Sequence, residues 1–499
     1  MLKLIPLICG IIGLLAAFVY FSWVSRVNGK KADYQIIAKN NDLFHRDEWM
    51  TIIITIIVLS AATGVFVGWF ACGLYAYGAA VTLLVEFAGS RVIARGRTEL
   101  SLTDDNTRAF RISYRSGAAA GLMMTSFGLL ALGAIFIPFK LQSAVTAIAC
   151  YAFGASTVVI FNRTRFKPVA DLYDSYIETV VSAIILSSLA VKTSNITSTF
   201  NTRTAAIFPL IVIGIGILAS VIGSLFVRGR ERSWEGLHIN ICVIVSAVLV
   251  AVSSAFLSYR MLQSYVYAVA LVIGVVLGIA TAMCSSRKMI FVPAVLFAIA
   301  MIVPYYFIGL YGIALAALGF VAFTAVMISI NTFGLVTDTK STIVNLGNGY
   351  STIASALAVL AVFVAFIDAG HLVTISIMVP KVLAGLLIGV TMPLVYVTIY
   401  NKSTEDKDYS FILDMTAILI PVLIGLFLGV QTLGGLMGGL VTSGMITSFL
   451  INNFGSNNES NREGSYLVVS SVNTLIKYMT IVALVLAPVF SEFGGIIPN

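Results

Sequence analysis

Three carboxylates carry the most distinctive chemistry of this sequence, because Asp171, Asp174 and Glu178 interrupt an otherwise apolar stretch. Their spacing of i, i+3 and i+7 places them on one face of a helix that we expect over about residues 169–191. That stretch is long enough to cross a bilayer. Ionised groups inside a membrane are costly, so acids on one stripe of such a helix indicate an ion or proton path.

A simpler alternative is that these acids only cap the start of the helix, where carboxylates complement the helix dipole. Pro168 favours a helix that begins at this point. Capping would suit Asp171. It does not account for Glu178, which lies ten residues beyond Pro168, more than two helical turns. We therefore interpret Glu178 as a buried ion-path residue.

Buried acids need a cation, and Lys477 is the candidate within the last apolar run. On helix position alone, snorkelling to the membrane surface explains a lysine there as well as pairing with an acid does. The presence of buried acids favours pairing. Asp338 and Asp414 lie near helix ends and suit ordinary interfacial caps. Glu86 is a further candidate for an interior acid.

The composition indicates what must surround these residues. Of 499 residues, 59% are hydrophobic and only 10% are charged. No soluble domain of this length has such a composition, so we expect a polytopic membrane protein. The net charge of +8 would suit nucleic acid, but the basic residues are spread over short loops, which excludes that partner. The five cysteines lie unpaired in apolar runs and are interpreted as packing residues.

Apolar runs of the length that a bilayer demands, roughly 20 residues, recur along the whole chain. They predict about sixteen transmembrane helices in a single domain over residues 1–499, an all-α polytopic architecture. The runs lie at about 5–24, 50–70, 71–90, 117–139, 143–162, 169–191, 205–227, 236–258, 262–284, 288–308, 310–335, 342–368, 373–400, 411–430, 432–452 and 465–490. The first run is long for a secretory signal, so we expect it to be a helix of the mature protein.

Basic residues gather on one side of this arrangement. The loops after odd-numbered helices hold most of the 30 lysines and arginines. By the positive-inside rule those loops are cytoplasmic. We therefore expect an integral protein of the cell membrane with both termini on the non-cytoplasmic side. The basic residues of the opposite loops are Lys140, Lys192, Arg203 and Arg260.

Several segments carry a family resemblance, in the same order along nearly the whole chain. They are FACGLYAYGAAVTLLVEFAGSRVIARGRTE, YAFGASTVVIFNR, ADLYDSYIETVVSAIIL, VPKVLAGLLIGVTMPLVY and NTLIKYMTIVALVLAP. Together they resemble helices 3, 5, 6, 13 and 16 of the membrane-integral pyrophosphatases, the H⁺- and Na⁺-translocating pumps driven by pyrophosphate. The resemblance implies that family's fold of sixteen helices and its homodimer.

The resemblance also implies an ion gate within the lipid bilayer. In the family, an arginine, an aspartate, a glutamate and a lysine form a membrane-embedded charge network. The matching positions here are Arg163, Asp171, Glu178 and Lys477, and all four residue types are kept. Asp174 stands where sodium pumps of the family carry a second acid. The implied cargo is H⁺ or Na⁺.

The hydrolytic motifs of the family are largely missing. The family's main acidic block, which holds Mg²⁺ and pyrophosphate, belongs between helices 5 and 6, but Asp171 follows Arg163 after only seven residues. Asn331 replaces an aspartate, Asn348 a lysine and Phe411 an arginine. Pyrophosphate needs clustered cations, and those cations need clustered carboxylates. The residual cytoplasmic acids are Asp338, Asp408 and Asp414, too few for a multi-metal site.

We therefore expect a pyrophosphatase-like protein that conducts or exchanges H⁺ or Na⁺ through a retained gate without hydrolysing pyrophosphate. On this interpretation it has no assigned catalytic residue, metal ligand or cofactor. One alternative is an active pyrophosphate-energised pump, which would be an inorganic diphosphatase with Mg²⁺, and in some members K⁺, as cofactor. Another is a non-transporting structural or regulatory membrane partner. The sequence leaves open whether the chain is an enzyme.

Overall fold

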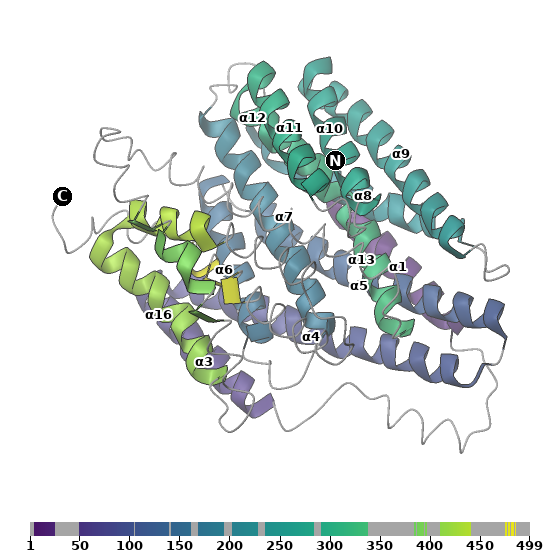
Figure 1. Cartoon of the computed structure of the whole chain (residues 1–499), viewed down its shortest axis with the longest axis horizontal. Helices are drawn as coiled ribbons and strands as arrows, with labels where there is room; N and C mark the ends of the chain where they lie inside the picture. The colour runs from purple at the N-terminus through teal and green to yellow at the C-terminus, as the bar shows by residue number, and fades with distance from the viewer. Residues whose placement is uncertain are drawn as a thin grey trace. The chain divides into compact units, whose positions relative to one another are not determined.

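Apolar helices form nearly all of the chain that the structure describes (Figure 1). The structure is a computed structural model. It describes residues 4–24, 49–103, 105–138, 141–160, 168–193, 202–227, 235–283, 291–337 and 410–440, with parts of 384–396 and 475–485. The helices are α1 (Ile5–Val24), α3 (Trp49–Phe66), α4 (Trp69–Ser101), α5 (Asn106–Phe136), α6 (Leu141–Ile160), α7 (Pro168–Thr193), α8 (Thr202–Ser224), α9 (Glu235–Leu262), α10 (Tyr265–Met283), α11 (Phe291–Ile308), α12 (Leu310–Ala322), α13 (Thr324–Thr337) and α16 (Ser410–Leu428).

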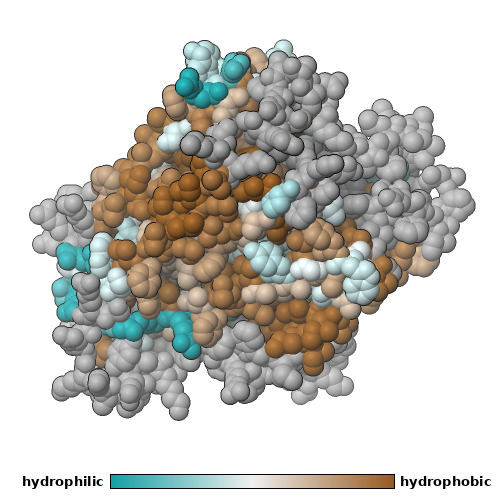
Figure 2. All heavy atoms as spheres, turned by 180° about the vertical axis from the view of Figure 1, so that it is seen from behind, coloured by the Kyte–Doolittle hydropathy of each residue, from teal (hydrophilic) through white to brown (hydrophobic). Residues whose placement is uncertain are grey.

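The chain is an all-α membrane protein. Six of the described helical stretches are long and apolar enough to cross a bilayer, and five shorter apolar helices accompany them. Large apolar side chains lie on the outside, among them Phe18 at 69% exposure and Phe256 at 65%. Figure 2 shows broad brown, hydrophobic areas on one face, as expected of a surface that faces lipid. The total of about sixteen spans, in one domain, stays a prediction.

Helices α4 and α5 are longer than hydropathy suggested. They contain 33 and 31 residues and run through most of residues 91–116, which lie between the spans predicted at 71–90 and 117–139. The cause is local, since this stretch is polar but rich in good helix formers. Asp105 starts α5, because its side chain accepts a hydrogen bond from the backbone N–H of Thr107 at 3.0 Å. The connection between the two helices is therefore very short.

The predicted helix over 310–335 is divided in two. α12 ends at Ala322, and the backbone N–H of Phe323 bonds back to the carbonyls of Phe320 and Val321 before α13 starts at Thr324. Between α3 and α4, the chain turns at Gly68, whose φ of +131° is open to glycine and strained for other residues. The predicted runs at 50–70 and 71–90 already separate α3 from α4 close to Gly68, whereas no break is predicted at Phe323, because apolar residues continue across it.

The chain forms two compact units. The first comprises Met1–Asp47, Val81–Ala144 and Pro168–Ile353. In it, α5 packs against α1, α7, α8 and α13, and α12 packs against α7, α8, α10 and α11. Small residues permit close helix packing in a membrane protein. On α5, Gly121 lies against the backbone of Ser329 in α13, and Gly128 lies against the ring of Tyr176 in α7.

The second unit comprises Glu48–Ala80, Val145–Lys167 and Ala354–Asn499. Its clearest contact is a reciprocal one between α4 and α6. Gly78 of α4 lies against the carbonyl of Tyr151, and Gly154 of α6 lies against the carbonyl of Tyr75. A methyl group at either glycine would collide with the facing backbone. This approach fixes the position of α6, which leads toward the predicted gate arginine.

Candidate functional site

Helix α7 buries nearly every described side chain along its length, including two acids. Asp174 is 1% exposed and Glu178 is 3% exposed. They are four residues apart, so they are neighbours on one helix face, about 5–6 Å between Cβ atoms. Two carboxylates this close and this deeply buried repel each other if both are ionised. Sharing one proton, or binding one cation between them, relieves this repulsion.

The opposite face of α7 is anchored to its neighbours. Tyr176 donates a hydrogen bond from Oη to the backbone carbonyl of Thr125 in α5 at 3.1 Å. Val169 lies against Gly89 of α4. At 100° per residue, Asp174 and Glu178 are turned from Val169 by roughly 140° and 180°. The tyrosine and valine contacts therefore hold the helix while the acids face away from α4 and α5.

A third buried acid lies on α4. Glu86 is 3% exposed, and its Oε1 accepts a hydrogen bond from the hydroxyl of Ser90, one turn later, at 2.8 Å. Gly89, on the same part of α4, is the residue that lies against Val169 of α7. The sequence singled out Glu86 as an interior acid, and its burial agrees. The turn of α4 that carries Glu86 and Gly89 packs on the face of α7 that carries Val169.

In the second unit, a hydrogen bond joins neighbours of two predicted gate cations. Thr157 Oγ1 and Tyr478 Oη are 3.1 Å apart. Because Thr157 donates its one hydroxyl proton to the carbonyl of Phe153 at 2.8 Å, Tyr478 must be the donor in the other bond. The rings of Phe153 and Tyr478 also pack at 5.7 Å between centroids. Thr157 precedes Arg163 by six residues, and Tyr478 directly follows Lys477.

The side chains of the other six predicted site residues lie outside the described part of the structure. Arg163, Lys477, Asp338 and Asp408 lie outside the described residues. Asp171 and Asp414 lie within α7 and α16, but their side chains are outside the described part. The structure thus brings Asp174 and Glu178 together, whereas the full gate stays a prediction. Among the described residues, no three histidine, cysteine, aspartate or glutamate side chains are grouped as metal ligands.

Sequence reasoning missed the hydroxyl groups that support these positions. The contacts of Tyr176 with Thr125 and of Tyr478 with Thr157 join helices far apart in the chain. Their only sequence signal is a polar side chain at helical spacing from the acids or the lysine. That signal is weak, since serine, threonine and tyrosine are common in membrane helices for packing reasons.

Comparison with known proteins supplies a family. The profile of the family described as "Inorganic H+ pyrophosphatase" matches residues 11–165, 167–287 and 275–353. The chain is 24% identical to a candidate K(+)-stimulated pyrophosphate-energized sodium pump from Clostridium tetani, covering 99% of this chain and 98% of that protein. It is 21% identical to a K(+)-insensitive pyrophosphate-energized proton pump from Methanosarcina mazei, covering 73% and 75% respectively.

The alignment with the Clostridium protein also reveals a difference in length. It extends over 672 residues, whereas this chain has 499 in all. The relative therefore contains long stretches that have no counterpart here. In addition, the family profile is interrupted at residue 166, within the short link between α6 and α7.

Proposed function

Since this chain belongs to the inorganic H⁺ pyrophosphatase family, we propose that it is an ion-translocating relative that retains the membrane gate and has lost pyrophosphate hydrolysis. The observation that carries this proposal is the pair of buried acids Asp174 and Glu178 on α7. Buried acids of this kind would be costly without a role in moving or binding a cation.

The gate that we propose consists of Arg163, Asp171, Asp174, Glu178 and Lys477. Asp174 and Glu178 would bind or relay H⁺ or Na⁺, and the two basic residues would compensate their charge when the ion leaves. The hydrogen bond between Thr157 and Tyr478 supports this arrangement. It joins the chain segments next to both basic residues, so it would keep Arg163 and Lys477 in a fixed relation.

Loss of hydrolysis is supported by what the chain lacks. The alignment covers nearly the whole of both chains, and the relative from Clostridium tetani contains long stretches that this chain lacks. The interruption of the family profile at residue 166 falls where the metal-binding block would belong. Without that block, Asp338, Asp408 and Asp414 are left to bind Mg²⁺ and pyrophosphate. Three scattered acids do not neutralise several divalent ions.

The active-pump alternative has one observation in its favour, namely that the alignment covers 98% of a relative named as a sodium pump. On this alternative, Mg²⁺ and K⁺ would be cofactors. We also propose, from the family resemblance, that the chain forms a homodimer and that both termini lie on the non-cytoplasmic side.

A flux assay in liposomes distinguishes these functions. Purified protein is reconstituted, and H⁺ and Na⁺ movement is measured along an imposed gradient, with and without Mg²⁺-pyrophosphate. We expect gradient-driven flux that Glu178→Gln abolishes, because the amide neither releases a proton nor binds a cation as a carboxylate does. The control Asp105→Asn keeps the helix cap of α5 and should leave the flux unchanged.

Other outcomes of this assay would each refute the proposal. Uphill transport driven by pyrophosphate would establish the active pump. Absence of flux for both ions, in a protein that is folded and inserted, would favour the structural or regulatory role. Flux that survives Glu178→Gln would show that the ions pass elsewhere.

A further inference from the structure

One end of the first unit gathers guanidinium groups and aromatic rings from three helices. Arg115 of α5 lies with its Cζ 5.0 Å from the ring centre of Trp23, in the last turn of α1. Arg95 of α4 lies with its Cζ 6.0 Å from the ring centre of Phe21 in α1, and Arg91 lies 4.4 Å from the ring of Phe87 on its own helix. These distances are within the range of cation–π attraction. The end of α1 therefore lies beside arginines of α4 and α5.

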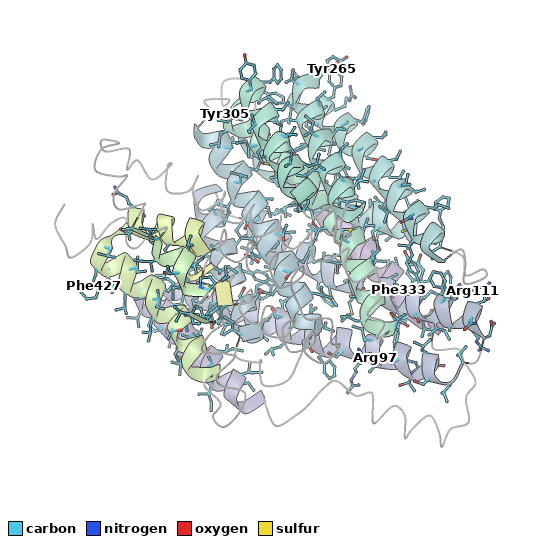
Figure 3. The ribbon with its side chains drawn as sticks, viewed as in Figure 1. Arg97, Arg111, Tyr265, Tyr305, Phe333 and Phe427 are labelled. Atoms are coloured by element: carbon cyan, nitrogen blue, oxygen red, sulfur yellow. The ribbon has the colours of Figure 1, made fainter. Side chains whose placement is uncertain are left out.

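The arginines of this region, which we call the arginine collar, outnumber the nearby acids. The collar comprises Arg91, Arg95, Arg108, Arg111 and Arg115. Figure 3 shows Arg111 at the outer end of α5. Arg97 is not included, because its Nε and Nη2 both donate to the carbonyl of Leu335 at 3.0 and 2.8 Å.

Three described acids belong to α4 or to the start of α5, and one of them, Glu86, lies five residues before Arg91 and is only 3% exposed. Glu99 is fully buried, and one of its carboxylate oxygens lies 3.8 Å from Nη2 of Arg95. Asp105 accepts a hydrogen bond from the N–H of Thr107 at the start of α5. Asp105 is exposed, whereas Glu86 and Glu99 are buried, so three acids stand against the five arginines of the collar. Within the described part of the three helices, this end therefore carries a positive excess.

An apolar surface continues from the collar along α1. Leu15, Phe18 and Val19 are 62%, 69% and 42% exposed, and Trp23 is 41% exposed. Their spacing places them on one face of the helix. On α4, Leu84 is 49% exposed and precedes Phe87 by one turn. The surface thus passes from bare hydrocarbon through aromatic rings to guanidinium groups.

The length of α4 indicates where this transition lies. A helix of 33 residues is about 50 Å long, against a hydrocarbon core of roughly 30 Å. The last turns of α4, which carry Arg95, therefore extend beyond the apolar core. Arginines with an aromatic ring at this level are typical of the membrane–water boundary.

We propose that the arginine collar binds the headgroup of an anionic phospholipid, with its acyl chains along the exposed face of α1. A phospholipid has the same order of groups as this surface, a charged end followed by hydrocarbon. The basic loops are expected on the cytoplasmic side, where anionic lipids are concentrated. A free phosphate would match the guanidinium groups but would leave the adjoining aromatic and aliphatic side chains uncovered.

Trp23 provides a reporter at the site. In a full-length variant that keeps Trp23 and carries Trp49→Phe, Trp69→Phe and Trp234→Phe, fluorescence is measured in phosphatidylcholine vesicles. The vesicles contain a small equal fraction of either brominated phosphatidylglycerol or brominated phosphatidylcholine. Bromine quenches tryptophan on contact. We expect the anionic lipid to quench more at equal content, with a preference of about fivefold for each arginine that contributes.

Charge variants test whether the collar causes that preference. The combination Arg91→Gln, Arg95→Gln and Arg115→Gln should make the two lipids quench equally. The control Arg260→Gln removes an exposed arginine at the end of α9 and should keep the full preference. If the triple variant does not fold, the preference of the parent protein is followed with added salt, and it must decline because salt screens exposed charges.

Three results would overturn the proposal. The first is equal quenching by both lipids in the parent protein. The second is an anionic preference that persists unchanged at high salt or in the folded triple variant. The third is release of the quenching by millimolar inorganic phosphate, which would identify a site for soluble anions instead of lipid.

Discussion

The spacing of Asp174 and Glu178 in the sequence already predicts that their two carboxylates lie side by side. Carboxylates four residues apart share a helix face whatever surrounds them, so the sequence could predict that they act together. It could also predict the burial of Glu178, because the residues around it are apolar. What it could not predict is which side of α7 is anchored. That depends on Tyr176 reaching Thr125, a contact between distant parts of the chain.

The hydroxyl pair of Thr157 and Tyr478 gives a prediction at the same scale. Tyr478→Phe should lower the free energy of unfolding by about 1 kcal/mol, since it removes one buried hydrogen bond. Thr157→Val should lower it by about 1–2 kcal/mol, since it removes the bond from Tyr478 and the bond to the carbonyl of Phe153. The double variant should cost less than the sum, because both changes remove the same interaction. Thermal or denaturant unfolding of the purified protein measures all three. Additive losses would show that the two hydroxyls do not interact.

Helix α4 shows that hydropathy can underestimate the length of a helix. The apolar part of α4 ends near residue 90, where the predicted span of 71–90 also ends. The helix continues to Ser101 because arginine, glutamate and leucine are good helix formers in water. Hydropathy reports where the membrane ends, whereas backbone hydrogen bonding decides where the helix ends. The two coincide only when a helix-breaking residue lies at the boundary.

The contact of α4 with α6 gives a prediction with an internal control. Gly78→Ala places a methyl group against the carbonyl of Tyr151, so the helices must separate, at a cost of about 1–3 kcal/mol in unfolding free energy. Gly73 lies on the same helix with nothing within 4 Å of the added methyl group. Gly73→Ala should stabilise by roughly 0.5–1 kcal/mol through helix propensity. Equal effects at both positions would contradict the close approach.

The end of α13 depends on Arg97. Its two donors satisfy the carbonyl of Leu335, which belongs to the last turn of α13, where carbonyls lack helical partners. Arg97→Ala should cost about 1.5–3 kcal/mol, as for a hydrogen bond to a charged group. Arg97→Lys should recover only part, because a lysine cannot donate in the same paired geometry. Hydrogen exchange at the end of α13 should increase in both, and not in Arg108→Ala.

For the whole molecule, composition sufficed to predict an all-α membrane protein, since few architectures satisfy the backbone in lipid. The family followed from motifs in their order along the chain. The division into two compact units did not follow, because one boundary between them passes through the middle of α4, between Ala80 and Val81. No change of composition marks that point.

The proposed loss of the pyrophosphate site predicts how the whole protein responds to pyrophosphate. A ligand that binds the folded state at a hundred times its Kd stabilises by about 2.7 kcal/mol. We expect Mg²⁺-pyrophosphate to leave the midpoint of thermal unfolding where Mg²⁺ alone leaves it. A dose-dependent rise that needs both components would show that the substrate still binds. An active family member measured in parallel provides the positive control.

The burial of acids on α7 also bears on how the protein is made. Inserting an acid near the centre of a membrane helix costs about 3 kcal/mol, while each leucine, isoleucine or valine returns about 0.5 kcal/mol or less. With Asp171, Asp174 and Glu178 in one segment, α7 is a poor candidate for entering the bilayer by itself. Tyr176 donates its hydrogen bond to the carbonyl of Thr125 in α5, and α5 leaves the ribosome before α7. The segment would therefore enter the membrane against a helix already there, and nascent chains shortened to lack α5 should fail to insert it.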